Sequence, residues 1–356
     1  MNPPTIASTA TAVPLHAASQ EEVKTHLRGM LPLPARRMDA AMEMFDHVAV
    51  DRRYSVEPLA QLGAVRGISG MQARYRTSAI ELGRQVASDA MAAAHVEARD
   101  IDLIITVSCT GIMIPSLDAH LVNELGFRAD VRRLPITELG CVGGAAALAR
   151  AHDFLIGFPD SRALVIAVEL PSLSLQRADV SPANLISTAL FGDGAAAAVL
   201  DGGRAASGPG RRVRILETLA HIFPESTWAL GFDLEDDGFH SVLSKEVPAL
   251  LKSEIGRLVQ TLSDRRGLSR DQLSCFVLHP GGRKILAFAE EELGLGRSDT
   301  QPSWDVLRDF GNQSSASVLF VLHEWLTKRQ PAAGEHGILA AFGPGLSTEM
   351  LLLEWS

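Results

Sequence analysis

Two parts of this chain line up without a gap when the sequence is shifted by 171 residues (311 − 140). Residues 100–111 then lie over 271–282, and residues 140–145 (Gly-Cys-Val-Gly-Gly-Ala) lie over 311–316 (Gly-Asn-Gln-Ser-Ser-Ala). Few residues are identical, so chance similarity is the alternative to duplication. The order, spacing and type of the elements agree together, which favours a duplicated strand–helix–strand unit. Such a duplication predicts an α/β fold with two similar halves.

Hydrophobic periodicity assigns most of the elements. Continuous apolar runs, typical of buried parallel strands, cover residues 102–108, 163–170 and 274–279. Residues 201–212 are rich in glycine and arginine and form the predicted linker, which divides the chain into halves of residues 1–205 and 206–356. The other expected strands cover 5–13, 131–137, 191–200, 213–220, 337–342 and 349–354, and an irregular acidic stretch covers 232–238. The expected helices cover 21–30, 35–45, 75–96 (with a capping-type start at Thr77), 115–125, 248–265, 283–293 and 303–328, the last being interrupted at Gly311.

Cys141 lies between the strand predicted at residues 131–137 and an alanine-rich helical run that continues to about Gly157. At the first turn of a helix, free N–H groups and a partial positive charge favour thiolate over thiol. Gly143 and Gly144 would let a substrate or another chain segment approach closely. A buried cysteine in a site packed with small residues is the alternative interpretation.

The repeat places Cys141 and Asn312 at the starts of equivalent helices, and Ser108 and His279 at the ends of equivalent strands. Helix starts and strand ends meet in one crevice in α/β folds. A thiolate beside an imidazole can take an acyl group from a thioester, while His279 and Asn312 donate hydrogen bonds to an oxyanion or an enolate. A strand-end histidine bonded to backbone and a helix N-cap asparagine are the alternatives for each residue alone. Together with the repeat, the three favour catalysis.

Charge and cysteine content exclude several classes of protein. A net charge of −9 argues against a general nucleic-acid binder. Three widely spaced cysteines form neither a disulfide framework nor a zinc pattern, and they suit a reducing cytoplasm. The first residues lack the basic start and apolar run of a signal peptide, and no stretch approaches the roughly 20 apolar residues of a membrane span. We therefore expect a cytoplasmic protein without a membrane span, a metal or a redox cofactor.

Five motifs that occur in order carry a resemblance to a known family. With these motifs, from about residue 5 to the C-terminus, the chain resembles the type III polyketide synthases, the chalcone synthase-like family. The resemblance implies the thiolase fold, a five-layered αβαβα arrangement of two pseudo-symmetric halves, and a homodimer that uses malonyl-CoA and acyl-CoA as substrates. The motifs are Gly-Cys-Val-Gly-Gly, Leu-Phe-Gly-Asp-Gly-Ala-Ala, His-Pro-Gly-Gly, Gly-Asn-Gln-Ser-Ser-Ala and Phe-Gly-Pro-Gly-Leu-Ser.

The resemblance also implies a role for individual residues. Cys141 resembles the nucleophile that carries the starter and the growing chain, and His279 and Asn312 resemble the pair that supports decarboxylation of malonyl-CoA. The further residues that it implies are Phe191 and Phe239 as gatekeepers, Gly343, Pro344 and Gly345 as the loop shaping the cyclisation pocket, Ile114 and Pro115 as a dimer-interface turn whose peptide bond can be cis, and Arg52 and Arg53 as contacts for CoA phosphates.

Several positions of the implied cavity wall bear on the product. Cys109 falls where plant members of the family carry a threonine, and it could alter cyclisation together with Glu169 and Ser314; simple packing is the alternative. Pro171 stands where a polar or thiol residue is expected. The small wall residues Ser174, Ser187 and Gly231 leave room for a long flexible starter, as in bacterial alkylpyrone and alkylresorcinol synthases.

These observations predict an acyltransferase that condenses an acyl-CoA starter with malonyl-CoA by decarboxylative Claisen condensation. We expect a medium- or long-chain fatty acyl starter and a pyrone or resorcinol product. A tetrahydroxynaphthalene synthase-type reaction that uses malonyl-CoA alone is the nearest alternative. A ketoacyl-acyl carrier protein synthase III-like enzyme uses the same three residue types, but the acidic chain is an unhelpful background for docking an acidic carrier protein.

Overall fold

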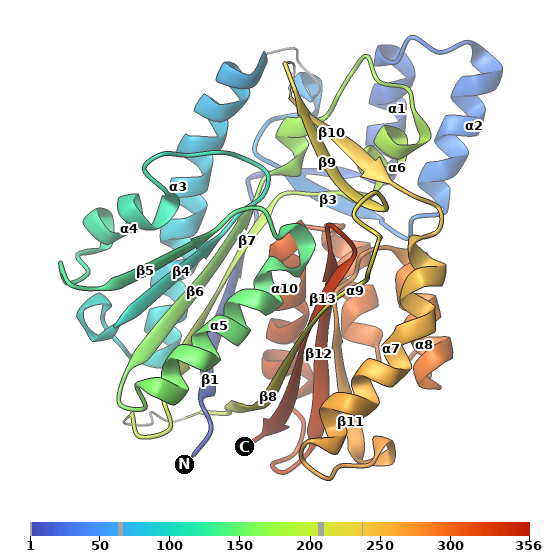
Figure 1. The fold of residues 1–356 in the computed structure, drawn as a ribbon. Helices are drawn as coiled ribbons and strands as arrows, with labels where there is room; N and C mark the ends of the chain where they lie inside the picture. Colours follow the sequence, from blue (N-terminus) through green and yellow to red (C-terminus); the bar gives the residue numbers. More distant parts are fainter. Residues whose placement is uncertain (1, 63–66, 206–209, 237) are drawn as a thin grey trace.

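The computed structural model describes residues 2–62, 67–205, 210–236 and 238–356 (Figure 1). The strands are β1 (Thr5–Ala12), β2 (His16–Ser19), β3 (Arg52–Ser55), β4 (Leu103–Val107), β5 (Arg132–Ile136), β6 (Arg162–Glu169), β7 (Gly194–Asp201), β8 (Val213–Ile222), β9 (Leu230–Glu235), β10 (Gly238–Leu243), β11 (Leu273–Leu278), β12 (His336–Gly343) and β13 (Ser347–Trp355). The α-helices are α1 (Gln20–Met30), α2 (Ala35–Asp46), α3 (Gly67–Ala94), α4 (Leu117–Leu125), α5 (Gly143–Gly157), α6 (Pro182–Leu190), α7 (Val247–Asp264), α8 (Arg283–Leu293), α9 (Gln301–Phe310) and α10 (Ser317–Glu324). Three short 3-10 turns border the site: η3 (Gly140–Val142), η4 (Pro171–Ser174) and η6 (Ser314–Ala316).

The strand order of the large sheet reads almost the same from its two ends towards its middle. It runs β5-β4-β6-β7-β1 in the N-terminal half and β11-β12-β13-β8 in the C-terminal half. In each half a parallel pair (β4 with β6, β11 with β12) is followed by antiparallel neighbours. The halves join where β1 pairs with β8 through Thr5 with Arg214 and Ile6 with Val213. This symmetry is the structural counterpart of the sequence repeat.

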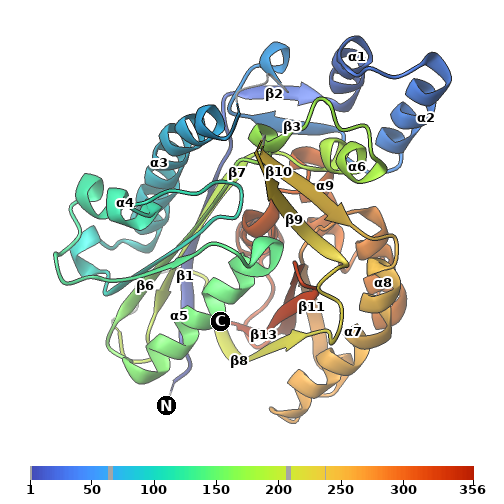
Figure 2. The same cartoon turned by 45° about the horizontal axis from the view of Figure 1, so that its top comes forward.

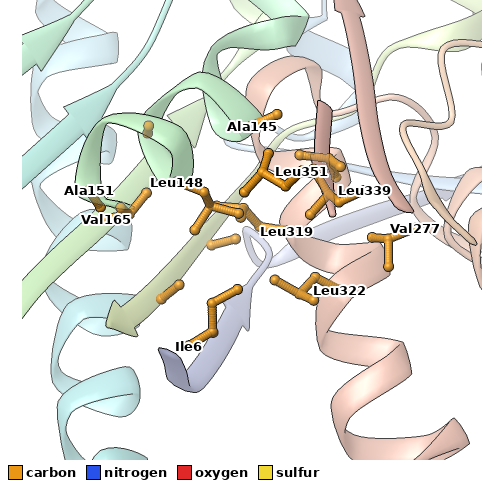
Figure 3. Packing of buried hydrophobic residues seen from close by; sticks show 14 of the residues in the cluster. Ile6, Ala145, Leu148, Ala151, Val165, Val277, Leu319, Leu322, Leu339 and Leu351 are labelled. Carbon is orange, nitrogen blue, oxygen red and sulfur yellow. The ribbon is translucent and has the colours of Figure 1, made fainter. Parts of the chain in front are cut away.

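Five layers follow from this arrangement, and the predicted thiolase fold is confirmed (Figure 1). Helices α3 and α4 cover the outer face of the N-terminal strands, and α7 and α8 cover the outer face of the C-terminal strands. Helices α5 and α10 form the middle layer, where Leu148 and Leu319 pack among side chains from both halves, including Val165 of β6 and Leu339 of β12 (Figure 3). Apolar burial on both sides of the strands explains why they are almost uninterrupted hydrophobic runs.

A smaller assembly lies across one end of the strands (Figure 2). Helices α1, α2 and α6 share a hydrophobic cluster that includes Phe45 and Leu185. The hairpin of β9 and β10 packs against α6. Strands β2 and β3 form an antiparallel pair whose connection consists of α1 and α2. This end of the molecule also holds the turn that carries Cys141.

Three expectations about local structure are wrong, each for a physical reason. Helix α3 begins at Gly67, so Thr77 lies inside it and bonds the Ala73 carbonyl instead of capping. Helix α4 begins at Leu117, because Pro115 belongs to the preceding turn. The stretch predicted to be irregular is mostly strand: its acidic residues lie on the exposed part of an antiparallel hairpin, where charge does not oppose pairing.

The sequence patterns also missed α6 and the antiparallel pair of β2 and β3, which are short and lack clear periodicity. The predicted division at residue 206 lies outside the described residues. Asp201, at the start of the predicted linker, ends β7 and is buried between Arg162 and Arg212, at 2.9 and 2.6 Å. In the parts of the chain that the structure describes, we find no helix long and apolar enough to cross a membrane.

Candidate active site

Cys141 lies in a tight 3-10 turn directly before α5, in which there is no room for most side chains. Gly140 adopts a positive φ of +56°, and a Cβ atom there would lie 2.4 Å from Cγ of Pro344. A Cβ at Gly144 would lie 2.1 Å from the carbonyl oxygen of Ser315. The glycines therefore let the end of β12 and the η6 turn approach Cys141 closely.

The environment of the Cys141 thiol differs from the expectation of a stabilised thiolate. The pKa of Cys141 is raised to about 11, mainly by burial and to a smaller extent by the nearby Glu169 carboxylate. Hydrogen bonds with Ser314 and Asn312 oppose this rise. The thiol donates to the Ser314 hydroxyl over 3.5 Å. Desolvation therefore outweighs the start of α5, and Cys141 is a neutral thiol at pH 7 in the free protein.

Asn312 is held in one orientation by its own turn. The side chain is 2% exposed, and its Oδ1 accepts a hydrogen bond from the Ser314 N–H at 2.8 Å. The Ser317 hydroxyl lies 3.3 Å from the same oxygen. With its oxygen engaged in this way, the carboxamide presents its N–H group to the thiol of Cys141. Asn312 thus acts as a local cap and also faces the Cys141 thiol.

His279 follows β11 at the end of the C-terminal strands. The main-chain N–H of His279 donates to the carbonyl oxygen of Ala340 in β12 at 2.8 Å, and Ala340 lies three residues before Gly343. A Cβ at Gly343 would lie 2.7 Å from the amide nitrogen of Val142, so His279 and Cys141 lie at the same end of the sheet. The ring is 1% exposed, neither ring nitrogen has a partner among the described residues, and burial lowers its pKa to about 3. His279 is therefore neutral at pH 7, with one N–H to donate.

A buried carboxylate lies behind the thiol. Glu169, fully buried at the end of β6, accepts hydrogen bonds from the Cys109 amide (3.1 Å), the Thr110 hydroxyl (2.8 Å) and the Ser315 hydroxyl. Burial raises the pKa of Glu169 despite these donors. The Cys109 sulfur lies 3.3 Å from the same Ser314 hydroxyl that Cys141 contacts. Cys109, Glu169 and Ser314 therefore form one polar network with the Cys141 thiol.

The two predicted gatekeepers lie in different surroundings. Phe191 caps α6 and pairs with Asn312 in a short parallel bridge, with Asn312 N–H donating to Leu190 O at 2.9 Å. Phe239 lies on β10 and packs edge-to-face against Phe232, at 6.3 Å between ring centroids. Only Phe191 is therefore tied directly to the candidate catalytic residues.

The remaining wall residues come from four segments. Pro344 packs on Gly140, and Gly345, with φ of +66°, donates its N–H to Leu230 at the base of the β9–β10 hairpin. A Cβ at Gly231 would meet open space. Ser174 bonds within η4, and Ser187 is half-buried on α6.

The two arginines predicted to contact CoA differ sharply. Arg52 is exposed and lies over the Tyr54 ring, 5.6 Å from its centroid. Arg53 is only 6% exposed and donates to the carbonyl groups of Thr188 and Ala189 at the end of α6. Its side chain completes the C-terminus of that helix, so the expectation that Arg53 meets a phosphate is wrong.

The turn at Ile114 and Pro115 has the expected cis peptide bond. Ile114 is 89% exposed, and Ile112 nearby is 53% exposed. Below them, the Tyr75 ring fills the space in which a side chain at Gly111 would lie. Two exposed aliphatic side chains on one rigid turn form an apolar surface that water covers poorly.

Sequence reasoning missed two buried polar residues of the site. Ser315 bonds Glu169, and its position in the repeat opposite Gly144 could have marked it. Asp193 is fully buried two residues after Phe191, and an aspartate inside an apolar strand motif was its signal. Among the residues that the structure describes, no group of three or more His, Cys, Asp or Glu is placed to hold a metal ion.

Comparisons with known proteins match one family over nearly the whole chain. Family models described as "Chalcone and stilbene synthases" match residues 37–204 (N-terminal domain) and 214–355 (C-terminal domain). A 1,3,6,8-tetrahydroxynaphthalene synthase of Streptomyces peucetius subsp. caesius is 37% identical over 98% of this chain and 93% of its own. A phloroglucinol synthase of Pseudomonas fluorescens is 34% identical over 96% of this chain and 97% of its own. The crystal structure of the tetrahydroxynaphthalene synthase of Streptomyces coelicolor superposes with a TM-score of 0.93 at 33% identity, covering 99% of both chains.

Proposed function

The chain belongs to the chalcone and stilbene synthase family, the type III polyketide synthases, and we propose that it builds an aromatic polyketide from malonyl-CoA alone. The names of its relatives support this tetrahydroxynaphthalene synthase-type reaction over the fatty acyl starter that the wall residues suggested. Its substrates are then CoA thioesters, and the reaction needs no other cofactor.

Loading begins at Cys141. The thiol attacks the carbonyl carbon of the thioester, the bond from that carbon to the CoA sulfur breaks, and CoA leaves as a thiol after taking up a proton. Because burial raises the pKa of Cys141 to about 11, its proton leaves as the bond forms. Neutral His279, with one ring nitrogen free to accept, is the proposed base.

Decarboxylation and condensation then depend on two neutral donors. Loss of CO2 from a malonyl thioester leaves an enolate, whose oxygen accepts hydrogen bonds from His279 and Asn312. The fixed Asn312 carboxamide is the single observation that carries this proposal, because its oxygen is occupied by Ser314 N–H and its N–H group faces the nucleophile. The enolate carbon attacks the acyl group on Cys141, and the thiolate leaves.

The network around Glu169 supports a role in closing the ring. Cys109 and Ser314 connect this carboxyl group to Cys141 through the hydrogen bonds described above. Such a network can hold a water molecule or a proton beside a thioester that must be released. We assign Glu169, Cys109 and Ser314 to control of cyclisation and release.

Substrate entry and assembly use residues away from the thiol. Phe191 and Phe239 are the proposed gatekeepers of the substrate entrance. Arg52 is the arginine that remains available for a CoA phosphate. A second copy of the chain covers the Ile112–Ile114 turn, whose exposed side chains then reach the partner's cavity. Gel filtration of Ile114→Asp tests this, and an unchanged dimer contradicts it.

A fatty acyl starter is the second candidate. The observation that favours it is the open space around Gly231, which leaves this part of the wall without a side chain. Gly231→Phe would then reduce the use of long acyl-CoA and leave the use of malonyl-CoA unchanged.

Product analysis decides between these functions. Purified protein is incubated with malonyl-CoA alone and, separately, with malonyl-CoA plus fatty acyl-CoAs, and the products are identified by mass spectrometry. We expect an unalkylated aromatic product in both incubations, and none from Cys141→Ala, while Cys275→Ala, which removes a buried cysteine elsewhere, remains active. An alkylated product alone would favour the second candidate. Activity that needs an acyl carrier protein would exclude both.

A further inference from the structure

Asp193 is a fully buried carboxylate that lies outside the chemistry described so far. It is two residues after Phe191 and directly before β7. One oxygen accepts from the Ser172 N–H at 2.8 Å. The other accepts from the Val56 N–H at 2.8 Å and the Ser172 hydroxyl at 2.6 Å. A carboxylate with three close donors holds the donating segments together strongly, because hydrogen bonds to a charged group are stronger than those between neutral groups.

These bonds connect three separate parts of the cap over the site. Val56 follows β3, Ser172 belongs to η4, and Asp193 ends the turn after Phe191. The main chain adds a fourth bond, from the Asp193 N–H to the Tyr54 carbonyl at 2.9 Å. Asp193 therefore fixes the end of the Phe191 turn against both β3 and η4.

The same turn is paired with Asn312. Gly192 N–H donates to Asn312 O at 3.1 Å, and Asn312 N–H donates to Leu190 O at 2.9 Å. Gly192 cannot shift easily, because even a Cβ there would lie 2.5 Å from the Phe310 carbonyl. A displacement at Asp193 would therefore pass directly to the main chain of Asn312.

We propose that Asp193 is a positioning residue for the condensation: its buried carboxylate fixes the Phe191 turn and, through the main-chain pairing, sets the place of the Asn312 carboxamide. The inference rests on the proposed role of Asn312 at the enolate oxygen. Small displacements of such a donor cost large factors in rate, because the hydrogen bond must meet charge that develops only during the reaction.

The charge on Asp193 gives the proposal a pH signature. The pKa of Asp193 is raised to about 6, mainly by burial and to a smaller extent by Glu57, which follows β3. Arg53 of β3 lies beside Gly192, and Arg74 of α3 lies 3.4 Å from Glu57, whereas Arg52 of β3 is exposed. Turn η4 itself carries no charged side chain. Below about pH 6 the carboxyl group is neutral and its tie to the three donors weakens.

Asp193→Asn tests the proposal, with Asp201→Asn as the matched control. Both aspartates are buried, and Asp201 lies at the far end of β7, where its partners are Arg162 and Arg212. At pH 8 we expect Asp193→Asn to lower kcat for malonyl-CoA about 10- to 100-fold, with little change in KM and with complete alkylation of Cys141 by iodoacetamide. Asp201→Asn should lower the melting temperature and leave kcat within about twofold.

The pH profile separates positioning from a merely structural role. The ratio of the wild-type kcat to that of Asp193→Asn should fall from its value at pH 8 to near 1 at pH 5, because the wild-type side chain has lost its charge there. A kcat within about twofold of the wild type at pH 8, or a ratio independent of pH, overturns the proposal. If wild-type protein makes no product from malonyl-CoA or acyl-CoAs, the proposed function fails instead.

Ser172→Ala provides a milder version of the same test if Asp193→Asn does not fold. It removes one of the three donors and keeps the carboxylate and the Ser172 N–H. We expect kcat to fall about three- to tenfold at pH 8 with an unchanged KM. A kcat equal to that of the wild type overturns the positioning role.

Discussion

The turns that carry Cys141 and Asn312 occupy equivalent places in the two halves and have diverged in one respect. Each begins with a glycine of positive φ, +56° at Gly140 and +71° at Gly311. Each passes through a 3-10 turn, η3 or η6, into a helix of the middle layer. The backbone scaffold is therefore shared, and the side chains account for the difference.

The N-terminal turn has glycines at the positions where the C-terminal turn has polar side chains. Gly143 and Gly144 have no side chains, whereas their counterparts Ser314 and Ser315 place hydroxyl groups beside Cys141 and Glu169. The two turns pack against each other, and the carbonyl of Ser315 occupies the space beside Gly144. The glycines of the N-terminal turn thus leave space for the polar groups of the C-terminal turn. Neither half could form this arrangement alone.

Asn312→Ala should produce the largest effect on this pair of turns. We expect kcat for malonyl-CoA decarboxylation to fall about 10²- to 10³-fold, because one of two proposed oxyanion donors is lost. Asn184→Ala, which removes another buried carboxamide, should destabilise the fold and change kcat only a few-fold. Release of CO2 from malonyl-CoA measures both. Equal losses in the two variants would mean that the carboxamide of Asn312 acts only as a cap.

His279 and its counterpart Ser108 differ in whether they titrate. The folded pKa of His279, about 3, lies below its ordinary value of 6.5, so the unfolded chain binds more protons between these values. Stability from this group is complete above about pH 6.5 and is lost as the pH falls towards 3. We expect the wild type to lose about 3 kcal/mol more than His279→Gln between pH 7 and pH 4. Urea unfolding at each pH measures the difference, and parallel curves would contradict the buried neutral ring.

Gly144→Ala tests how tightly the two turns pack. A methyl group there meets the main-chain oxygen of Ser315, which cannot move aside, so we expect a loss of about 3 kcal/mol in the free energy of unfolding. Gly231→Ala points into open space and should change it by less than about 0.5 kcal/mol. Urea unfolding compares them. A tolerated Gly144→Ala would show that the contact between the halves is looser than the structure indicates.

Ser314→Gly should give the smallest effect and makes the C-terminal turn resemble the N-terminal one. Glycine suits the φ of +49° at this position, so the fold is retained. The Ser314 hydroxyl lowers the pKa of Cys141, and its removal raises that pKa further. Alkylation of Cys141 by iodoacetamide at pH 9 should therefore slow about two- to fivefold. Faster alkylation would contradict the lowering of the Cys141 pKa by the Ser314 hydroxyl.

Much of the fold could be predicted because the repeat and the apolar runs depend on local pattern. The strands β4, β6 and β11 and the helix α8 lie where the hydrophobic pattern placed them. The acidic β9–β10 hairpin could not be predicted in this way, because its pairing depends on an antiparallel partner and its charges lie on an exposed face. The prediction that Arg53 contacts a CoA phosphate was wrong for a related reason. A sequence does not show whether an arginine side chain faces solvent or the end of a helix.

The sequence by itself determined which residues are the candidates for catalysis. Spacing and duplication selected Cys141, His279 and Asn312 before any coordinates, because a duplicated unit repeats helix starts and strand ends at fixed intervals. Only the tertiary structure decided their ionisation and orientation. Burial makes Cys141 and His279 neutral, and hydrogen bonds from Ser314 and Ser317 turn the Asn312 carboxamide towards the thiol. Desolvation and hydrogen-bond geometry depend on all the neighbours that folding brings together, and no single segment of the chain contains them.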